Sequence, residues 1–270
     1  MVTFPPCKIN LGLNVVAKRS DGYHDLVTCY YPVPWCDVLE IVPSSSFSFH
    51  TDGRHIPGNT DSNLCVRAWQ MLHDEFAIDP VEIHLLKHIP AGAGLGGGSS
   101  DGAYALLMLN DLFSLGLTQA QLAGYAARLG SDCPFFVYSV PMIGQGRGEQ
   151  LDRANVSLKG KYLGIVKPDL HISTAEAFGG IMPRRPSADI RTVVEDRPVM
   201  EWKGLLKNDF ETTIFPRFPL LEAIHQKMYA LGAIYASLTG TGSAVYGIFD
   251  EEPAISDEFS NHICWTGPVD

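Results

Sequence analysis

The sequence lacks a concentrated basic surface, closely spaced cysteines and long apolar runs. Its 270 residues include 20 lysines and arginines against 30 acidic residues, and the basic ones are scattered. Without a basic face, we expect neither a nucleic-acid backbone nor an anionic membrane as a partner. An anionic ligand must instead be bound locally, by backbone amides and a few cations.

The six cysteines form no C-x-x-C pair and no Cys/His spacing typical of zinc sites, so we expect most of them to be reduced, buried thiols. No predominantly apolar run reaches the ~20 residues that span a bilayer. Prolines and a lysine interrupt the N-terminal segment where a signal peptide needs a continuous apolar core. These absences predict a soluble, cytoplasmic protein, and we expect it to be bacterial.

The mixed order of strand-like and helix-like segments predicts an α+β fold. Residues 8–16, KINLGLNVV, alternate apolar and polar side chains, which indicates a half-buried strand with Lys8 and Asn10 on its polar face. Helical spacing marks residues 63–76 and 102–115. A polar, glycine-containing run at residues 140–153 lies near the middle of the chain. We therefore predict two domains, residues 1–150 and 151–270.

Thr118 and Gln121 form a capping box that predicts the start of another helix, and Gly130 predicts its end. Further along, the spacing predicts a strand at 162–168 and a helix at 219–232. Two helices in succession therefore follow residue 102 before the chain reaches the second domain.

Residues 87–102, KHIPAGAGLGGGSSDG, place six glycines between a strand-like and a helix-like segment. This arrangement presents unpaired backbone N–H groups at a helix N-terminus, where phosphate oxygens bind. Glycine permits close backbone approach and positive φ, whereas an ordinary tight turn needs only one or two glycines. We expect a phosphate-binding loop in which Ser99 and Ser100 cap the helix, donate to phosphate or ligate magnesium.

Two other kinds of glycine loop fit less well. Gly92, Gly94 and Gly97 match the dinucleotide fingerprint G-x-G-x-x-G, and Asp111 lies near the spacing of its ribose-binding acid, which would indicate an NAD-dependent oxidoreductase. However, a second helix follows where a βαβ unit would return to a strand, and Asp111 falls inside a helical segment. A Walker A loop is excluded because no G-K-[ST] closes the motif.

Three motifs in the same order resemble the GHMP small-molecule kinases, the family of galactokinase, homoserine kinase and mevalonate kinase. They are the strand that carries Lys8 and Asn10, PAGAGLGGGSS at 90–100, and the glycine turn LTGTGSAVYGIF at 238–249. The segments CKINLGLNVVAKRSDGYHDL, GSDCPFF and HISTAEAF resemble more closely one branch of the family. Its members phosphorylate the 2-hydroxyl of 4-diphosphocytidyl-2-C-methyl-D-erythritol, in the non-mevalonate (MEP) route of isoprenoid and terpenoid biosynthesis.

The resemblance covers nearly the whole chain and thins between residues 183 and 207. It implies a two-domain GHMP kinase fold, with a ribosomal S5-like N-terminal domain, a ferredoxin-like C-terminal domain and a site in the cleft between them. It also implies ATP and Mg²⁺ as cofactors. We expect a monomer or weak homodimer whose partners are ATP and a small-molecule substrate.

The resemblance also implies the catalytic groups. Asp132, in GSDCPFF, is the expected base, and Lys8 is expected beside it, keeping the carboxylate ionised and stabilising the charge that develops during transfer. Asn10 is expected to position the acceptor hydroxyl. Without the resemblance, Asp132 would be read as an ordinary loop or capping aspartate and Lys8 as a solvated side chain.

Substrate and nucleotide contacts are implied in the same way. Tyr23 and His24 are expected to recognise the cytosine, with Phe178 on the other side of its ring and Thr174 nearby. The expected ATP-binding residues are Pro90, Gly92, Gly94, Leu95, Gly96, Gly97, Gly98, Ser99 and Ser100, with Asn63 and Lys87 near the adenosine. Gly240, Thr241 and Gly242 are expected to close over the reacting end of the site. The other interpretation of each is packing, capping or an ordinary turn.

Asp101 departs from what a phosphate site needs. A carboxylate so near a triphosphate should repel it, unless the side chain points away or meets magnesium. Two other functions remain open at this stage. Another GHMP kinase, of homoserine or mevalonate type, gives no reason for the DGYH segment; a catalytically silent nucleotide sensor gives no reason for intact Lys8 and Asp132.

Overall fold

The structure is a computed structural model that describes residues 1–184, 186 and 188–269. The chain divides into two compact units. We call the first unit Met1–Lys8, Trp35–Ala91 and Gly96–Val140, and the second unit Ile9–Pro34, Gly92–Leu95 and the chain from Pro141 onward. This grouping mixes stretches from both sides of position 150, and the predicted domains 1–150 and 151–270 remain a prediction.

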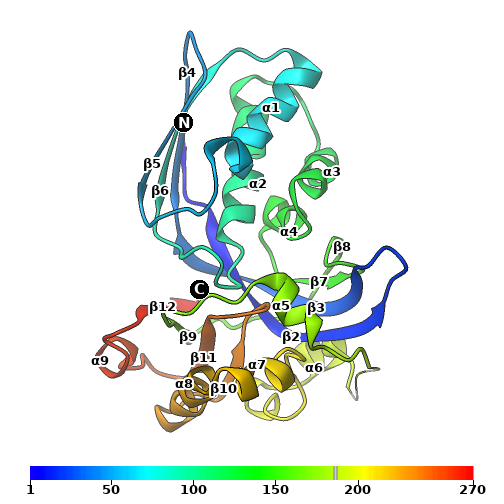
Figure 1. Cartoon of the computed structure of the whole chain (residues 1–270), viewed down its shortest axis with the longest axis vertical. Helices are drawn as coiled ribbons and strands as arrows, with labels where there is room; N and C mark the ends of the chain where they lie inside the picture. The colour runs from blue at the N-terminus through cyan, green and yellow to red at the C-terminus, as the bar shows by residue number, and fades with distance from the viewer. Residues whose placement is uncertain (185, 187, 270) are drawn as a thin grey trace. The chain divides into compact units, whose positions relative to one another are not determined.

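The first unit consists of a four-stranded sheet and four helices. The strand order is β1 (Val2–Thr3), β4 (Val38–Pro43), β6 (Val81–Lys87) and β5 (Ser48–Gly53), antiparallel except for the β5–β6 pair. Figure 1 shows the helices on one side of this sheet. They are α1 (Leu64–Phe76), α2 (Gly97–Leu112), α3 (Gln119–Leu129) and α4 (Cys133–Tyr138), with a 3₁₀ turn η1 (Thr60–Ser62) before α1.

The sheet of the first unit follows from a two-residue burial pattern. In β6, Val81, Ile83 and Leu85 are buried on the helix-covered face, as alternation in a strand requires. Lys87 has the same register and is only 2% exposed. The last residue of this strand is therefore a buried ammonium in an otherwise apolar row.

The predicted helix after Leu117 is confirmed. Thr118 caps α3, with both halves of the capping box formed by Thr118 and Gln121, and Gly130 follows its last residue. The predicted start of the preceding helix is wrong, because α2 begins at Gly97 and not at Gly102. Glycine has low helix propensity, so the pattern hid a first turn whose place tertiary contacts determine.

The second unit contains two four-stranded sheets. One has the order β10 (Tyr235–Leu238), β11 (Val245–Phe249), β9 (Lys161–Lys167) and β12 (Ile263–Val269), all antiparallel. The other has the order β2 (Pro6–Lys18), β3 (His24–Cys36), β7 (Met142–Gln145) and β8 (Gln150–Arg153). The first few residues of β2 and the last of β3 belong to the first unit.

Helices of the second unit pack against its sheets around an apolar core that includes Leu13, Val166 and Phe210. α8 (Pro219–Ala230) contacts β10 and β11, and α7 (Glu211–Arg217) contacts α8. The remaining elements are α5 (Thr174–Gly179), α6 (Ile190–Asp196), η2 (Val199–Glu201) and α9 (Ile255–Glu258). In the part of the chain that the structure describes, no helix is long and apolar enough to cross a bilayer.

The expectation of a half-buried β2 with a solvated polar face is wrong, since both faces of the strand are buried. Lys8 is 2% and Asn10 1% exposed. Burial is tolerated because the polar groups have partners: the Asn10 amide donates to Thr28 Oγ1 at 2.9 Å, and the Tyr246 hydroxyl donates to the Asn10 carbonyl at 2.8 Å. Burying polar side chains such as Lys8 and Asn10 costs free energy of folding unless they have partners, which marks them as candidate functional residues.

Candidate active site

The predicted Lys8 and Asp132 lie together in the first unit. Lys8 Nζ is 3.6 Å from Asp132 Oδ2, with the lysine side chain 3% and the aspartate side chain 33% exposed. Burial lowers the pKa of Lys8, and the nearby Asp132 opposes that shift only in part. A buried cation thus faces a carboxylate that is still reachable from solvent.

Asp132 occupies the N-cap position of α4, yet its side chain makes no capping hydrogen bond to that helix within the described chain. The helix begins instead with Pro134 near its first position, which needs no N–H partner. The alternative interpretation of Asp132 as a helix cap therefore has no support in this geometry.

The glycine loop links β6 to α2 and adopts backbone conformations that side chains disfavour. Gly92, Gly94 and Gly96 have φ of 65°, 76° and 71°, which confirms the expectation of several positive values. A Cβ at Gly97 would lie 2.8 Å from Ile89 Cγ2, whereas one at Gly98 would meet no described atom within 4 Å. Packing thus requires most, but not all, of the loop glycines.

The serines that follow the loop do not cap α2. Its N-cap residue is Gly96, and the Ser100 amide closes the first turn by donating to the Gly96 carbonyl at 2.9 Å. The expected capping role of Ser99 and Ser100 is therefore wrong, since both lie inside the helix. Ser100 Oγ is buried and has no hydrogen-bond partner among the described residues, which leaves an unused oxygen in the first turn.

In the second unit, Asn10 binds the late glycine turn between β10 and β11. Its Oδ1 accepts hydrogen bonds from the Gly240 amide at 2.8 Å and from the Thr239 hydroxyl at 3.2 Å. Gly240 and Gly242 have φ of 54° and 84°, with Thr241 between them. The Asn10 side chain is thus largely committed to ordering this turn.

The same turn contacts the first part of the glycine loop. Thr239 Oγ1 lies 3.0 Å from the Gly94 carbonyl, and the Ala244 amide donates to the Ala93 carbonyl at 3.1 Å. A Cβ at Gly94 would lie 2.0 Å from the Thr239 carbonyl oxygen. Only glycine fits at position 94.

The aromatic residues predicted for the cytosine site lie in the second unit. His24 stacks on Phe178, with ring centroids 4.8 Å apart and planes 23° from parallel, and Phe178 meets Phe210 edge-on at 4.9 Å. Tyr23 is 56% exposed and has the Arg147 guanidinium 5.1 Å from its ring centroid. Arg147 was missed at the sequence level, where nothing distinguishes it within a polar run.

Asn63 and Lys87, predicted near the adenosine, both have structural partners in the first unit. Asn63 caps α1 by accepting the Cys65 amide at 2.9 Å. Lys87 Nζ donates to Asp101 Oδ2 at 2.6 Å and also to Asp37 Oδ2. The predicted contacts of Asn63 and Lys87 with nucleotide remain predictions.

The Asp101 side chain is buried in the first unit, where it pairs with Lys87. It is 2% exposed, and its Oδ1 is buried without a partner among the described residues. Burial raises the pKa of Asp101, while Lys87 acts to lower it. Burial acts to lower the pKa of Lys87, but the neighbouring Asp101 and Asp37 carboxylates outweigh it and raise the pKa. Sequence reasoning missed Asp37 because no local motif surrounds it.

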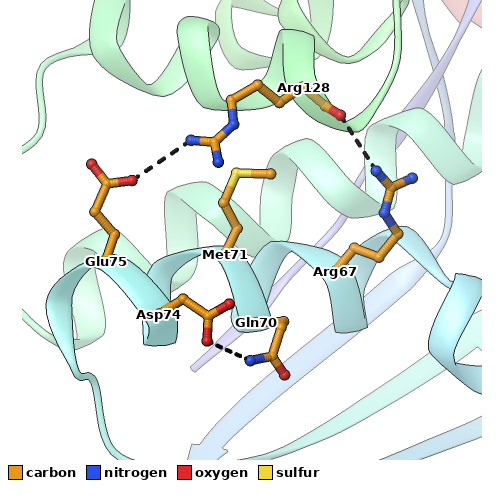
Figure 2. Close-up of a pocket in the computed structure, with 6 residues that line it drawn as sticks. All are labelled: Arg67, Gln70, Met71, Asp74, Glu75 and Arg128. Carbon is orange, nitrogen blue, oxygen red and sulfur yellow. Dashed lines mark hydrogen bonds and ion pairs between the residues drawn. The ribbon is translucent and has the colours of Figure 1, made fainter.

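Figure 2 shows a separate surface hollow over α1 and α3, in the first unit. Arg128 Nη1 lies 3.6 Å from Glu75 Oε2 at one side, and Arg67 donates to the Arg128 carbonyl at 3.4 Å at the other. No residue predicted for the active site lines it; the lining residues are Arg67, Gln70, Met71, Asp74, Glu75 and Arg128.

The described residues also contain no group of three or more His, Cys, Asp or Glu that could hold a metal ion.

Comparison with known proteins covers the whole chain. Residues 63–140 match the family model "GHMP kinases N terminal domain", and residues 199–262 match "GHMP kinases C terminal". A Bacteroides thetaiotaomicron protein named 4-diphosphocytidyl-2-C-methyl-D-erythritol kinase is 48% identical over 273 residues, covering 99% of each chain. A protein of the same name from Cytophaga hutchinsonii is 42% identical over 267 residues, covering 97% of each.

Solved structures give the same picture. The crystal structure of a 4-(cytidine 5'-diphospho)-2C-methyl-D-erythritol kinase matches with a TM-score of 0.84 and 30% identity, over 100% of this chain and 99% of the other. A homoserine kinase from Cytophaga hutchinsonii matches with a TM-score of 0.72 over 100% and 94% of the two chains, at 15% identity. At that identity the second match shows the fold alone.

Proposed function

The chain belongs to the GHMP kinase family, and we propose that it transfers the γ-phosphoryl group of ATP to the 2-hydroxyl of 4-diphosphocytidyl-2-C-methyl-D-erythritol. The products are ADP and the 2-phosphate. Two relatives named 4-diphosphocytidyl-2-C-methyl-D-erythritol kinase support this choice of acceptor. They are 42% and 48% identical to the chain along nearly their whole length. We place the reaction in the bacterial cytoplasm, as part of isoprenoid precursor synthesis.

The pairing of Lys8 with Asp132 is the observation that carries the proposal. Phosphoryl transfer depends mainly on positioning and electrostatic stabilisation, with a base to receive the hydroxyl proton. Asp132 is reachable from solvent, so its carboxylate can accept that proton. The Lys8 ammonium, 3.6 Å away, stabilises negative charge as the bond to the phosphorus forms.

The first turn of α2 is the proposed site for the triphosphate. The amides at the start of a helix lack intrahelical partners and point outward, and the helix dipole adds positive potential. The family implies magnesium with the nucleotide, and the unused Ser100 hydroxyl fits as a protein ligand. Magnesium commonly keeps waters and substrate phosphates as its other ligands; bound there, it would neutralise charge on the phosphate oxygens.

The aromatic residues of the second unit are proposed to hold the cytosine. The exposed Tyr23 ring offers a face for stacking, and Arg147 supports the ring by a cation–π contact. His24 and Phe178 lie in one stack, with Thr174 opening the helix that carries Phe178. This cluster distinguishes the proposed substrate from homoserine or mevalonate, which have no base to stack.

Replacing Asp132 tests the chemistry directly. The Asp132→Asn variant keeps the shape of the side chain but loses the carboxylate, so we expect turnover to fall by ~10²–10⁴-fold while nucleotide affinity stays near wild type. Turnover is measured as ADP release and affinity by calorimetry. Asp111→Asn, an exposed site on α2, is the matched control. Unchanged turnover in Asp132→Asn would refute the assignment.

The acceptor is tested by comparing ADP release with the diphosphocytidyl substrate, mevalonate, homoserine and galactose. We expect turnover only with the first. Preference for another acceptor would make this a different GHMP kinase, and nucleotide binding without turnover on any acceptor would favour the silent sensor.

A further inference from the structure

Three buried charged residues form a cluster in the first unit. Lys87 Nζ donates to one oxygen of Asp37 and, at 2.6 Å, to one oxygen of Asp101. Their side chains are 2%, 0% and 3% exposed, respectively. We call Asp37, Lys87 and Asp101 the carboxylate–lysine cluster.

The carboxylate–lysine cluster brackets the glycine loop in the sequence. Before the loop, Asp37 Oδ1 accepts the backbone amides of His88 and Ile89, at 2.6 and 2.8 Å. After the loop, Asp101 lies in the second turn of α2 and holds the same ammonium. The Lys87 ammonium therefore links the backbone before the loop, through Asp37, to the helix after the loop, through Asp101.

The ammonium also packs directly against the start of α2. A Cβ built on Gly97 would lie 3.0 Å from Lys87 Nζ and 2.8 Å from Ile89 Cγ2. Gly97 thus packs against the cluster, and it lies in the first turn of α2, the proposed site of the triphosphate. A shift of this turn by an ångström would misdirect its backbone amides.

We propose that the carboxylate–lysine cluster positions the phosphate-binding turn, with Lys87 acting through Asp37 and Asp101, in place of the direct nucleotide contact predicted for it. The inference rests on the proposed function, since it names what holds the nucleotide loop of that same site. Asp37 anchors the entry to the loop, Asp101 anchors α2, and Lys87 joins the two. Each buried carboxylate has a countercharge only while the lysine is present.

The test separates anchoring from folding by comparing two changes at one position. Asp101→Ala removes the anchor on α2 and leaves Lys87 paired with Asp37, so the remaining buried ammonium and carboxylate balance each other. Asp101→Asn keeps an oxygen that can accept from Lys87. We expect Asp101→Ala to weaken binding of the ATP analogue AMPPNP with magnesium roughly tenfold to a hundredfold, the scale of one lost hydrogen bond to a charged group, and Asp101→Asn to restore most of it.

The readouts are the AMPPNP dissociation constant by calorimetry, KM for ATP, and KM for the acceptor. The KM for the acceptor should be unchanged, because its proposed aromatic contacts lie in other elements. Lys87→Met, which leaves two buried carboxylates without a countercharge, should show a larger loss of affinity and a lower melting temperature. Asp111→Ala, exposed on the same helix, is the control.

A cluster that only stabilises the fold would behave differently. Asp101→Ala would then lower the melting temperature and leave the AMPPNP affinity and KM for ATP of the folded protein at wild-type values, which would overturn the inference. Equal losses in Asp101→Ala and Asp101→Asn would also overturn it, since the retained oxygen should matter. A wild-type protein that binds no AMPPNP would overturn the proposed function as well.

Discussion

Lys8 is a cation that the fold keeps away from water. Burial lowers the pKa of Lys8, and its neighbour Asp132 is a partly exposed carboxylate. We expect Lys8→Met to reduce kcat ~10²–10³-fold, as loss of a donor to developing charge does, with little change in KM for ATP. Steady-state kinetics measure this. The exposed Lys159→Met is the control, and a variant of Lys8 with normal kcat would remove it from the mechanism.

Tyr23 should contribute to binding and not to chemistry. Its ring is exposed and lies beside Arg147, and stacking on a base is worth ~1–3 kcal/mol. Tyr23→Ala should therefore raise KM for the diphosphocytidyl substrate roughly fivefold to a hundredfold, with KM for ATP unchanged. Tyr125→Ala, on α3, serves as the control. An unaffected acceptor KM would argue for a substrate without a base.

The sequence allowed the surroundings of some single residues to be predicted, but not those of others. Lys8 and Asp132 are 124 positions apart and were paired only through resemblance to a family; spacing alone could not join them. The burial of Lys87 was readable, because alternation along β6 puts it in register with Leu85. The role of Asp37 could not be predicted, since its partners come from the end of β6 and from the two residues that follow it.

Helices α1 and α2 approach each other closely at a glycine. A Cβ at Gly102 would lie 2.7 Å from Leu64 Cβ, whereas one at Gly124 in α3 would meet no described atom within 4 Å. Gly102→Ala should therefore destabilise the protein by ~1–3 kcal/mol through overpacking, although alanine is the better helix former. Gly124→Ala should stabilise it by ~0.4–1 kcal/mol. Urea denaturation measures both, and changes of the same sign would contradict this packing.

Element prediction succeeded where the signal was local. The capping box of α3 was confirmed at Thr118, because its hydrogen bonds join residues three apart. The start of α2 was misplaced by five residues, since glycines 97 and 98 carry no helical signal. Gly96 and Gly97 pack closely against Phe136, Ile89 and Lys87, which lie elsewhere in the first unit.

The thiols of the whole molecule should fall into two classes. All six cysteines are free, and Cys36 and Cys264 are only partly buried. Burial raises the pKa of Cys29 and of Cys133 to about 12, so almost no reactive thiolate forms there at pH 8. We expect iodoacetamide to label Cys36 and Cys264 first, and the buried four only after unfolding. Peptide mass spectrometry reads this out, and early labelling of Cys133 would contradict it.

The fold class of the whole chain was predicted correctly as the α+β GHMP kinase fold, and the matched family domains confirm it. Composition and periodicity reached only the α+β class, because they report local structure. The step to the family needed three motifs far apart in the sequence. Membership in the two compact units was not predictable, since the chain enters the second unit at Ile9 and leaves it again after Pro34.

Gly98 differs from its neighbours in the glycine loop, because a Cβ there would touch no described atom and its backbone is ordinary helix. The folded chain alone would accept alanine at this position, and alanine is the better residue for a helix. Packing therefore gives no reason for glycine at position 98, whereas the proposed function gives one: a methyl group there would take volume beside the proposed triphosphate site.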